Sequence, residues 1–213
     1  MIAETEATSA GALGLSGCGT VRVMRRLRIV PRWGGTPEND FYPWLTRALA
    51  ERSPAPFDDV RAIAMPDPAL PTIEGWVGRL SAELGGEVDA APETVLLGHS
   101  VGCQALLRYL ASLPDGVKYR GALLVAGWLS IDKPWDSIRP WLETSPDLAR
   151  ARRAVGELVV LLSDNDPFTA DHLESRRAWE ERASARVVVA PGGKHFNAAE
   201  EPAVLNILLN SFQ

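Results

Sequence analysis

A serine between two glycines is the feature of this sequence that most directly suggests chemistry. Ser100 stands in the motif GHSVG at 98–102, directly after the apolar run TVLLGH at 94–99 and before a stretch with helical spacing. The pattern G-x-S-x-G between a strand and a helix is the nucleophile elbow, a strained turn that exposes the serine hydroxyl. Only minimal side chains fit two positions before and after the serine, and Gly98 and Gly102 meet that need. We interpret Ser100 as a candidate nucleophile; the alternative is that the glycines only let a helix approach a strand closely.

A nucleophilic serine needs a general base, and the chain has three histidines. His99 lies inside the elbow with its side chain facing away from that of Ser100, which favours a packing role. His172 lies in a charged helical stretch and is expected at the surface. His195 lies in the loop APGGKHFN, directly after the last predicted strand, and is the candidate base by elimination and by position. The stretch NAAE at 197–200 resembles a capping box that would start the final helix and hold this loop still.

The base in turn needs a carboxylate that orients it. The segment LLSDNDPF follows a predicted strand and offers Asp164 and Asp166. Asp166 lies farther beyond the strand end and precedes Pro167, which fixes the turn, so we favour Asp166; Asp164 is expected to stabilise the turn. The resulting order along the chain is serine, aspartate, histidine, which is the order of α/β-hydrolases and not of chymotrypsin or subtilisin.

These side chains must be positioned by the elements around them, and strand and helix signals alternate along the chain. An amphipathic stretch begins near Glu38, with Thr36 as its expected cap and Pro37 at the first helical position. The strands are continuous apolar runs, typical of a parallel sheet covered on both faces. We predict an α/β fold, an open doubly wound, mostly parallel sheet of about six strands with helices on both faces. The expected strands are 27–30, 60–65, 94–99, 121–127, 157–163 and 185–190, and the expected helices are 38–52, 73–84, 101–113, 169–183 and 198–212.

Composition narrows the class of partner. The chain has 213 residues and a formal net charge of −5, so no basic surplus is available to neutralise nucleic-acid phosphates. The two cysteines are far apart and form no CxxC or Cys/His cluster, so we expect neither a metal site nor a disulfide framework. Cys103 is expected in the core. No run approaches the roughly 18 apolar residues that span a bilayer, and we expect a cytoplasmic protein without membrane partners.

The N-terminal segment raises the question of a lipid anchor. LSGC at 15–18 resembles a bacterial lipobox, with Cys18 as the anchor residue. A working signal has positive charge before its apolar segment, whereas this chain has two glutamates there, which argues against lipidation. We expect residues 1–24 to be a poorly ordered extension and residues 25–213 to form one domain.

Four segments together resemble a known group of enzymes. These are VPRWGG after the first strand, LLGHSVGCQALLRYL at the elbow, SDNDPF after the fifth strand and GGKHFN near the end. Over residues 27–213 the chain resembles the α/β-hydrolases, and within them the small serine hydrolases of the retinoblastoma-binding-protein-9 type and their bacterial relatives. The resemblance implies a compact sheet, little or no lid, the triad Ser100–Asp166–His195, and no metal or organic cofactor. The namesake binds a pocket protein through an L-x-C-x-E segment, which this chain lacks, so that partner is not expected here.

Backbone N–H groups are expected to hold the oxyanion of the reaction. The residue after the nucleophile, Val101, supplies one, and the loop after the first strand, PRWGG, supplies the other. We favour Trp33 as the second donor, with Gly34 as the next choice. Many relatives have His-Gly in this loop where the chain has Pro31-Arg32, so the identity of the second donor stays open.

The substrate is indicated only by aromatic residues. The segment 128–150 is a short lid-like insertion that holds Trp128, Trp135 and Trp141. These rings, with Phe168, either cover the edge of the core or form an aromatic wall beside the serine. The insertion is too short for a lipase-type lid, so small ester-like substrates are expected. Two alternatives stay open: thioester, lactone or aminoacyl-amide hydrolysis by the same triad, and a partner-binding protein with vestigial activity.

Overall fold

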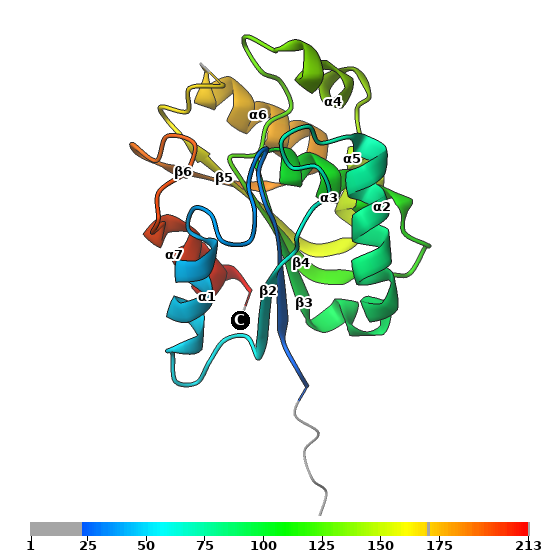
Figure 1. Cartoon of the computed structure of the whole chain (residues 1–213), viewed down its shortest axis with the longest axis vertical. Helices are drawn as coiled ribbons and strands as arrows, with labels where there is room; N and C mark the ends of the chain where they lie inside the picture. The colour runs from blue at the N-terminus through cyan, green and yellow to red at the C-terminus, as the bar shows by residue number, and fades with distance from the viewer. Residues whose placement is uncertain (1–22, 170, 213) are drawn as a thin grey trace, which may run out of the picture.

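A six-stranded sheet forms the centre of the protein. The computed structural model describes residues 23–169 and 171–212 (Figure 1). All strand pairs within that part of the chain are parallel, and the order across the sheet is β2-β1-β3-β4-β5-β6. The predicted α/β class and strand number are confirmed. The strands are β1 (Arg26–Val30), β2 (Asp59–Ala62), β3 (Thr94–His99), β4 (Tyr119–Val125), β5 (Val155–Ser163) and β6 (Arg186–Ala190).

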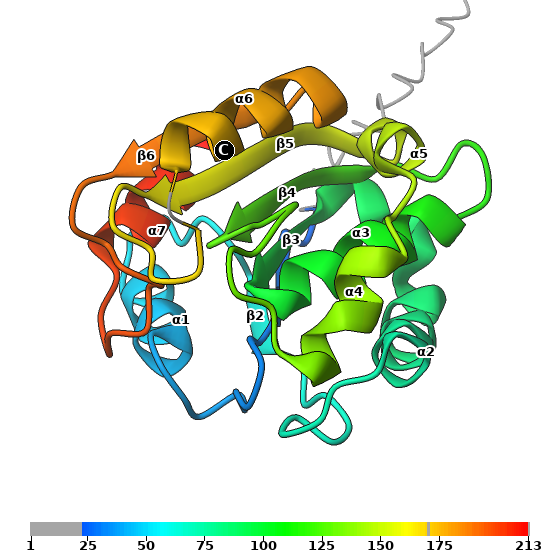
Figure 2. The same cartoon turned by 90° about the horizontal axis from the view of Figure 1, so that it is seen from above.

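Helices cover both faces of the sheet (Figures 1 and 2). Helices α1 (Tyr42–Ala50) and α7 (Pro202–Ser211) lie on one face, where they share a hydrophobic cluster with inward residues of the strands. The second cluster, on the other face, includes residues of α2 (Ile73–Leu84), α3 (Val101–Ser112), α5 (Leu148–Arg153) and α6 (His172–Ala183). Within the described ranges, none of the helices combines the length and the hydropathy that a membrane-spanning helix needs. The remaining short helices are η1 (Gly85–Glu93), η2 (Asp136–Ile138) and α4 (Arg139–Glu143).

Three helix starts differ from the sequence prediction. Helix α6 begins at His172 and not at residue 169, because the Asp171 side chain accepts from the N–H groups of Leu173 and Glu174. The first helix begins at Tyr42 and not near Glu38, because the backbone N–H and the hydroxyl of Thr36 both donate to Asn39 Oδ1 and close a turn there. The last helix begins at Pro202. The capping box expected at 197–200 is therefore wrong, and Glu201 accepts a hydrogen bond from the Ala198 N–H instead (3.1 Å).

The strand order reverses between β1 and β3, although all the strands run in the same direction. β3 lies between β1 and β4, whereas β2 lies beyond β1 at the sheet edge. In open parallel sheets the loops on either side of such a point diverge and leave a crevice at the carboxyl ends of the strands. Ser100 follows β3 directly, and the loops after β1, β5 and β6 reach the same end of the sheet (Figure 2). Residues 1–22, which include Cys18 and most of the expected extension, lie outside the described part of the chain.

Candidate active site

Ser100 occupies a strained turn between β3 and α3. Its φ is 55° and its ψ is −117°, a conformation that non-glycine residues adopt rarely. The backbone holds the turn because the Ser100 N–H donates to Val125 O (2.9 Å) and the Cys103 N–H donates to Ser100 O (2.9 Å). A Cβ at Gly98 would lie 2.8 Å from the backbone of Cys103, and one at Gly102 would lie 2.4 Å from Val30 O. The elbow therefore needs glycine at both positions, as its sequence pattern predicts.

The tight contact at Gly102 predicts a severe effect of Gly102→Ala. The added methyl group would meet the carbonyls of Val30 and Pro31, so either α3 or the loop after β1 must move. We expect a stability loss of about 1–3 kcal/mol, typical of an overpacked site. Activity should fall by at least roughly a hundredfold, because the shift displaces Ser100, the candidate nucleophile. Thermal unfolding and ester hydrolysis would be measured together.

Gly78→Ala is the matched control for this prediction. Gly78 lies in α2, and a Cβ there would meet nothing within 4 Å. Because alanine is the better helix former by about 1 kcal/mol, this variant should be as stable as the wild type or more so, with unchanged activity. Equal behaviour of the two variants would contradict the steric argument.

His195 and Asp166 form a buried pair. His195 Nδ1 lies 2.8 Å from Asp166 Oδ2, and both side chains are almost fully shielded from solvent. The other carboxylate oxygen, Asp166 Oδ1, accepts from the Phe168 N–H (3.0 Å), which fixes the carboxylate plane. The structure thus brings His195 to Asp166 and not to Asp164, as the sequence favoured. Because Nδ1 is engaged by the carboxylate, Nε2 is the ring nitrogen left for a reacting group.

The loop after β5 also holds in place the loop after β6, which carries His195 and is called the histidine loop below. Asp164 Oδ1 accepts from the Gly192 N–H (2.7 Å), and Asn165 Oδ1 accepts from the Lys194 N–H (2.8 Å). Asp164 was expected to stabilise its own turn; its side chain stabilises the loop that carries His195 instead. Nothing in the local sequence pattern indicated the role of Asn165.

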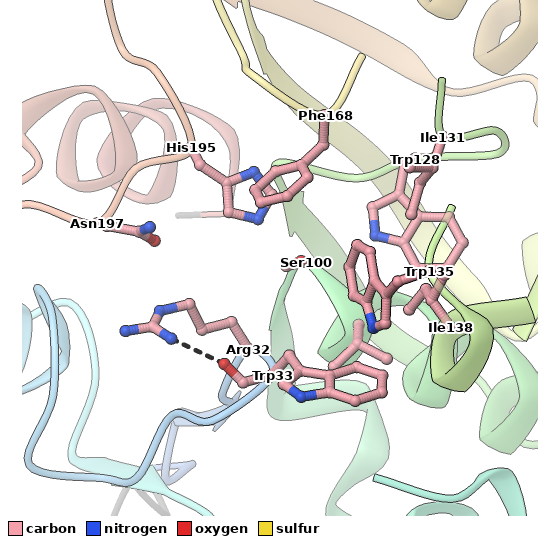
Figure 3. Close-up of a pocket in the computed structure, with 11 residues that line it drawn as sticks. Arg32, Trp33, Ser100, Trp128, Ile131, Trp135, Ile138, Phe168, His195 and Asn197 are labelled. Carbon is pink, nitrogen blue, oxygen red and sulfur yellow. Dashed lines mark hydrogen bonds between the residues drawn. The ribbon is translucent and has the colours of Figure 1, made fainter. Parts of the chain in front are cut away.

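Ser100 and His195 line one cavity of about 360 Å³. Figure 3 shows both side chains facing its interior, with the His195 ring above the serine. Among the described residues, no hydrogen bond joins the Ser100 hydroxyl to His195; such bonds often tighten only when substrate is bound. The cavity therefore places a hydroxyl and a carboxylate-paired imidazole on a shared space large enough for a small ligand.

The loop after β1 corrects one expected oxyanion donor. The Gly34 N–H donates to Pro68 O (2.7 Å), so Gly34 has no backbone donor to offer and the second choice is wrong. The Trp33 N–H donates to no group in the described ranges, and Trp33 lines the cavity with Ser100. Val101 is the first residue of α3, where backbone N–H groups have no partner within the helix. Trp33 and Val101 are thus the two predicted donors compatible with the hydrogen bonds of this site.

Aromatic and aliphatic side chains form one wall of the cavity. Trp135 contacts Trp33 with ring centroids 5.5 Å apart and Phe168 at 6.0 Å, and Phe168 lies edge-on to His195 at 4.7 Å. This row of rings runs from the loop after β1 to the histidine (Figure 3). The opposite side is polar, with Arg32 and Asn197. The apolar lining residues are Trp33, Val101, Trp128, Ile131, Trp135, Ile138 and Phe168.

Trp141 does not belong to this wall, and its assignment to the pocket is wrong. It is buried in the core, its Nε1 donates to Pro71 O (3.1 Å), and its ring packs edge-on against Trp76. For this ring the alternative interpretation, covering the core, is the correct one. Four further residues line the cavity without having been predicted, because none of them stands in a sequence motif that indicates a site: Arg32, Ile131, Ile138 and Asn197. In the described ranges, no three His, Cys, Asp or Glu side chains are grouped to hold a metal ion.

Comparisons with known proteins identify a curated relative and solved structures that share the fold. The chain is 24% identical over 194 residues to the putative hydrolase YdeN of Bacillus subtilis (strain 168), covering 88% of this chain and 96% of that protein. The crystal structure of the B. subtilis ydeN gene product superposes with a TM-score of 0.74 at 22% identity, over 87% of this chain and 97% of that one.

A second solved structure shares the fold at a similar sequence identity. The type II thioesterase BorB from the borrelidin biosynthetic cluster gives a TM-score of 0.61 at 21% identity, over 90% of this chain and 92% of that one. Both structures are compact α/β-hydrolase-like folds. Residues 27–207 match the family described as serine hydrolase, a match that extends over nearly all of the sheet and its helices. The chain belongs to the serine hydrolase family.

Proposed function

We propose that this chain hydrolyses small ester-like substrates through an acyl-enzyme, with Ser100 as nucleophile, His195 as general base and Asp166 as the orienting carboxylate. The observation that carries the proposal is the 2.8 Å contact between His195 Nδ1 and Asp166 Oδ2 at the edge of the cavity that Ser100 lines. Membership of the serine hydrolase family supports the hydrolytic class. Within that class, the four sequence segments support the retinoblastoma-binding-protein-9 type.

The proposed reaction has two halves. His195 Nε2 takes the Ser100 proton while the serine oxygen bonds to the substrate carbonyl, and the carbonyl electron pair moves onto its oxygen. The N–H groups of Val101 and Trp33 stabilise that oxyanion; losing one such donor typically costs about 2.7–4 kcal/mol of transition-state stabilisation. The tetrahedral intermediate then collapses, and His195 returns the proton to the leaving group. Water repeats the same steps on the acyl-enzyme and releases the acid.

The lining of the cavity supports an apolar acyl group of modest size. The row of rings formed by Trp33, Trp135 and Phe168 excludes water from one side of the serine, whereas Asn197 and Arg32 lie on the other (Figure 3). A cavity of about 360 Å³ lies at the lower end of the range for small-ligand sites. We propose that the acyl chain lies against the rings and that the leaving group departs along the polar side.

The proposed function is tested with a fluorophosphonate probe and a panel of p-nitrophenyl esters from acetate to laurate. Wild-type protein should be labelled once per chain and should hydrolyse the short and medium esters best. Thioesters, lactones and aminoacyl amides, assayed in parallel, decide among hydrolytic chemistries of the same triad. Absence of both labelling and turnover would contradict the proposal and favour the partner-binding alternative.

Trp135→Ala is predicted to move the chain-length preference toward longer acyl groups. Trp135 is 37% exposed and stands between Trp33 and Phe168, so its removal opens the wall without disturbing the core. We expect the optimum to shift by several carbons and KM for the shortest esters to rise severalfold, measured as kcat/KM across the panel. Trp44→Ala is the control, because Trp44 is a partly buried tryptophan of α1 outside the cavity lining. If the chain-length profile of Trp135→Ala is unchanged, the acyl group does not bind against this wall.

A further inference from the structure

A buried histidine next to the nucleophile makes contacts that the proposed reaction does not use. His99 is fully buried on the face of the sheet that carries α1. Its Nε2 lies 2.8 Å from the backbone carbonyl oxygen of His195, and its Nδ1 lies 2.8 Å from the hydroxyl of Tyr42 in α1. The same hydroxyl accepts a hydrogen bond from the Arg32 N–H (3.1 Å). Three hydrogen bonds thus connect the backbone of Arg32 to the backbone of His195.

The direction of each bond in this series is fixed by chemistry. A carbonyl oxygen only accepts, so His99 Nε2 carries the proton. Burial, the largest cause, lowers the pKa of His99 well below its usual value, so the ring is neutral and Nδ1 is a bare acceptor. The Tyr42 hydroxyl therefore donates to Nδ1, and its oxygen is left to accept from Arg32. Every donor in the series has one acceptor, and no other arrangement satisfies all of them.

The two ends of the series are the two loops that must be aligned for catalysis. Arg32 directly precedes Trp33, the proposed oxyanion donor. His195 stands between Lys194 and Phe196, whose φ values of 50° and 55° lie in the left-handed region that favours glycine. A loop held in that conformation needs external contacts to keep it. The hydrogen bond from His99 supplies one at the backbone of the base itself.

The rings of the series are also held by packing. Phe41 lies 4.8 Å from the Tyr42 ring and 5.4 Å from the His99 ring, measured between centroids. All three rings are completely buried. Close packing of completely buried rings opposes a change of rotamer in His99 or Tyr42, so the hydrogen bonds join the two loops through well-packed side chains.

We propose that His99 and Tyr42 are positioning residues. They hold the loop after β1, which carries the proposed oxyanion donor Trp33, and the general base His195 at a fixed distance from each other and from Ser100. The inference rests on the proposed function and extends it to residues that touch neither substrate nor the reacting atoms. His99 is thereby assigned more than the packing role that its place in the elbow suggests. Its effect is exerted in the transition state, where the oxyanion and the base must be aligned together.

Tyr42→Phe tests the proposal by removing one oxygen atom. It leaves His99 Nδ1 and the Arg32 N–H without partners while the ring packing stays. We expect kcat to fall by about tenfold to a hundredfold, the cost of a displacement of order 1 Å at the site, with KM within about twofold. A low-field NMR resonance of the His195 Nδ1–H, held by Asp166, should shift in this variant, and that signal requires no substrate.

Tyr109→Phe is the matched control. Tyr109 is a buried tyrosine of α3 whose hydroxyl pairs with that of Tyr119 (2.8 Å), and it is not among the residues that line the cavity. It loses a buried hydroxyl of the same kind, so its thermal stability should fall by a comparable amount while kcat and the His195 resonance stay unchanged. If Tyr42 has only a structural role, both variants will lose stability and keep kcat and the His195 resonance unchanged. That result would overturn the proposal.

A second variant and the wild-type assay complete the design. In the double variant Tyr42→Phe/His99→Phe the loss in kcat should equal the larger of the two single losses, because each change breaks the hydrogen bond between Tyr42 and His99. Additive losses would contradict a connected series. Failure of wild-type protein to bind the fluorophosphonate probe would reject the proposed function itself, and the positioning role with it. Wild-type labelling with an unimpaired Tyr42→Phe variant would reject only the present inference.

Discussion

Ser100→Ala is expected to remove ester hydrolysis almost entirely, with kcat reduced by roughly 10⁶, the size of the loss when a triad serine is deleted in a known serine hydrolase. The reason is that, among the described residues that line the cavity, Ser100 alone carries a hydroxyl and none carries a thiol. Alanine fits the turn as well as serine does, because the steric demand at this position comes from the neighbouring glycines. Intact-mass analysis after fluorophosphonate treatment should show the adduct on wild-type protein and none on the variant.

Ser81→Ala serves as the control for this prediction. Ser81 lies on α2, its hydroxyl donates to Val77 O within the helix (3.0 Å), and it is not among the residues that line the cavity. This variant should hydrolyse esters and accept the probe as the wild type does. Residual turnover in Ser100→Ala within tenfold of wild type would mean that another group attacks the carbonyl, and the acyl-enzyme pathway would have to be abandoned.

The sheet, and the positions of Ser100, Asp166 and His195 around one end of it, could be predicted from the sequence because both follow from local patterns. Continuous apolar runs between breakers predict buried parallel strands, and the strand at 94–99 and the helix at 73–84 have the predicted bounds. The start of the first helix was misplaced because Thr36 and Pro37 carry a cap signature. In the folded chain, the Asn39 side chain takes the Thr36 N–H and closes a turn, and the helix begins only after it.

The errors at the site share one physical cause, a long-range hydrogen bond. The Gly34 N–H donates to Pro68 O and is therefore not free for an oxyanion, and the Trp141 Nε1–H donates to Pro71 O, which holds that ring in the core. No local sequence pattern indicates either hydrogen bond. The hydrogen bond between Tyr42 and His99 joins residues 57 positions apart, and no local sequence pattern indicates it either. Residue type and strand order therefore indicate which groups gather at the sheet edge. The assignment of individual N–H groups requires knowing which partners the fold brings to them.

Asp166→Asn is the second large prediction, a fall in kcat of about 10⁴ if the site behaves as a Ser-His-Asp triad. The amide has nearly the shape of the carboxylate, so the fold should be unaffected. An asparagine, however, can present N–H to His195 Nδ1, which selects the tautomer with its proton on Nε2, where the serine proton must go. It also removes the negative charge that stabilises the imidazolium formed during attack. The measurement is kcat for the best ester of the panel, together with thermal unfolding.

Asp164→Asn separates this effect from any general sensitivity of the loop. Asp164 is two residues away and uses one oxygen to accept from the Gly192 N–H (2.7 Å). The asparagine oxygen can accept that same bond, so the histidine loop should keep its conformation and kcat should change little. The two variants make the same chemical change in one turn, and only the carboxylate bonded to His195 is expected to matter. If both variants lose activity equally, Asp166 acts through the loop conformation and not through the tautomer and charge of His195.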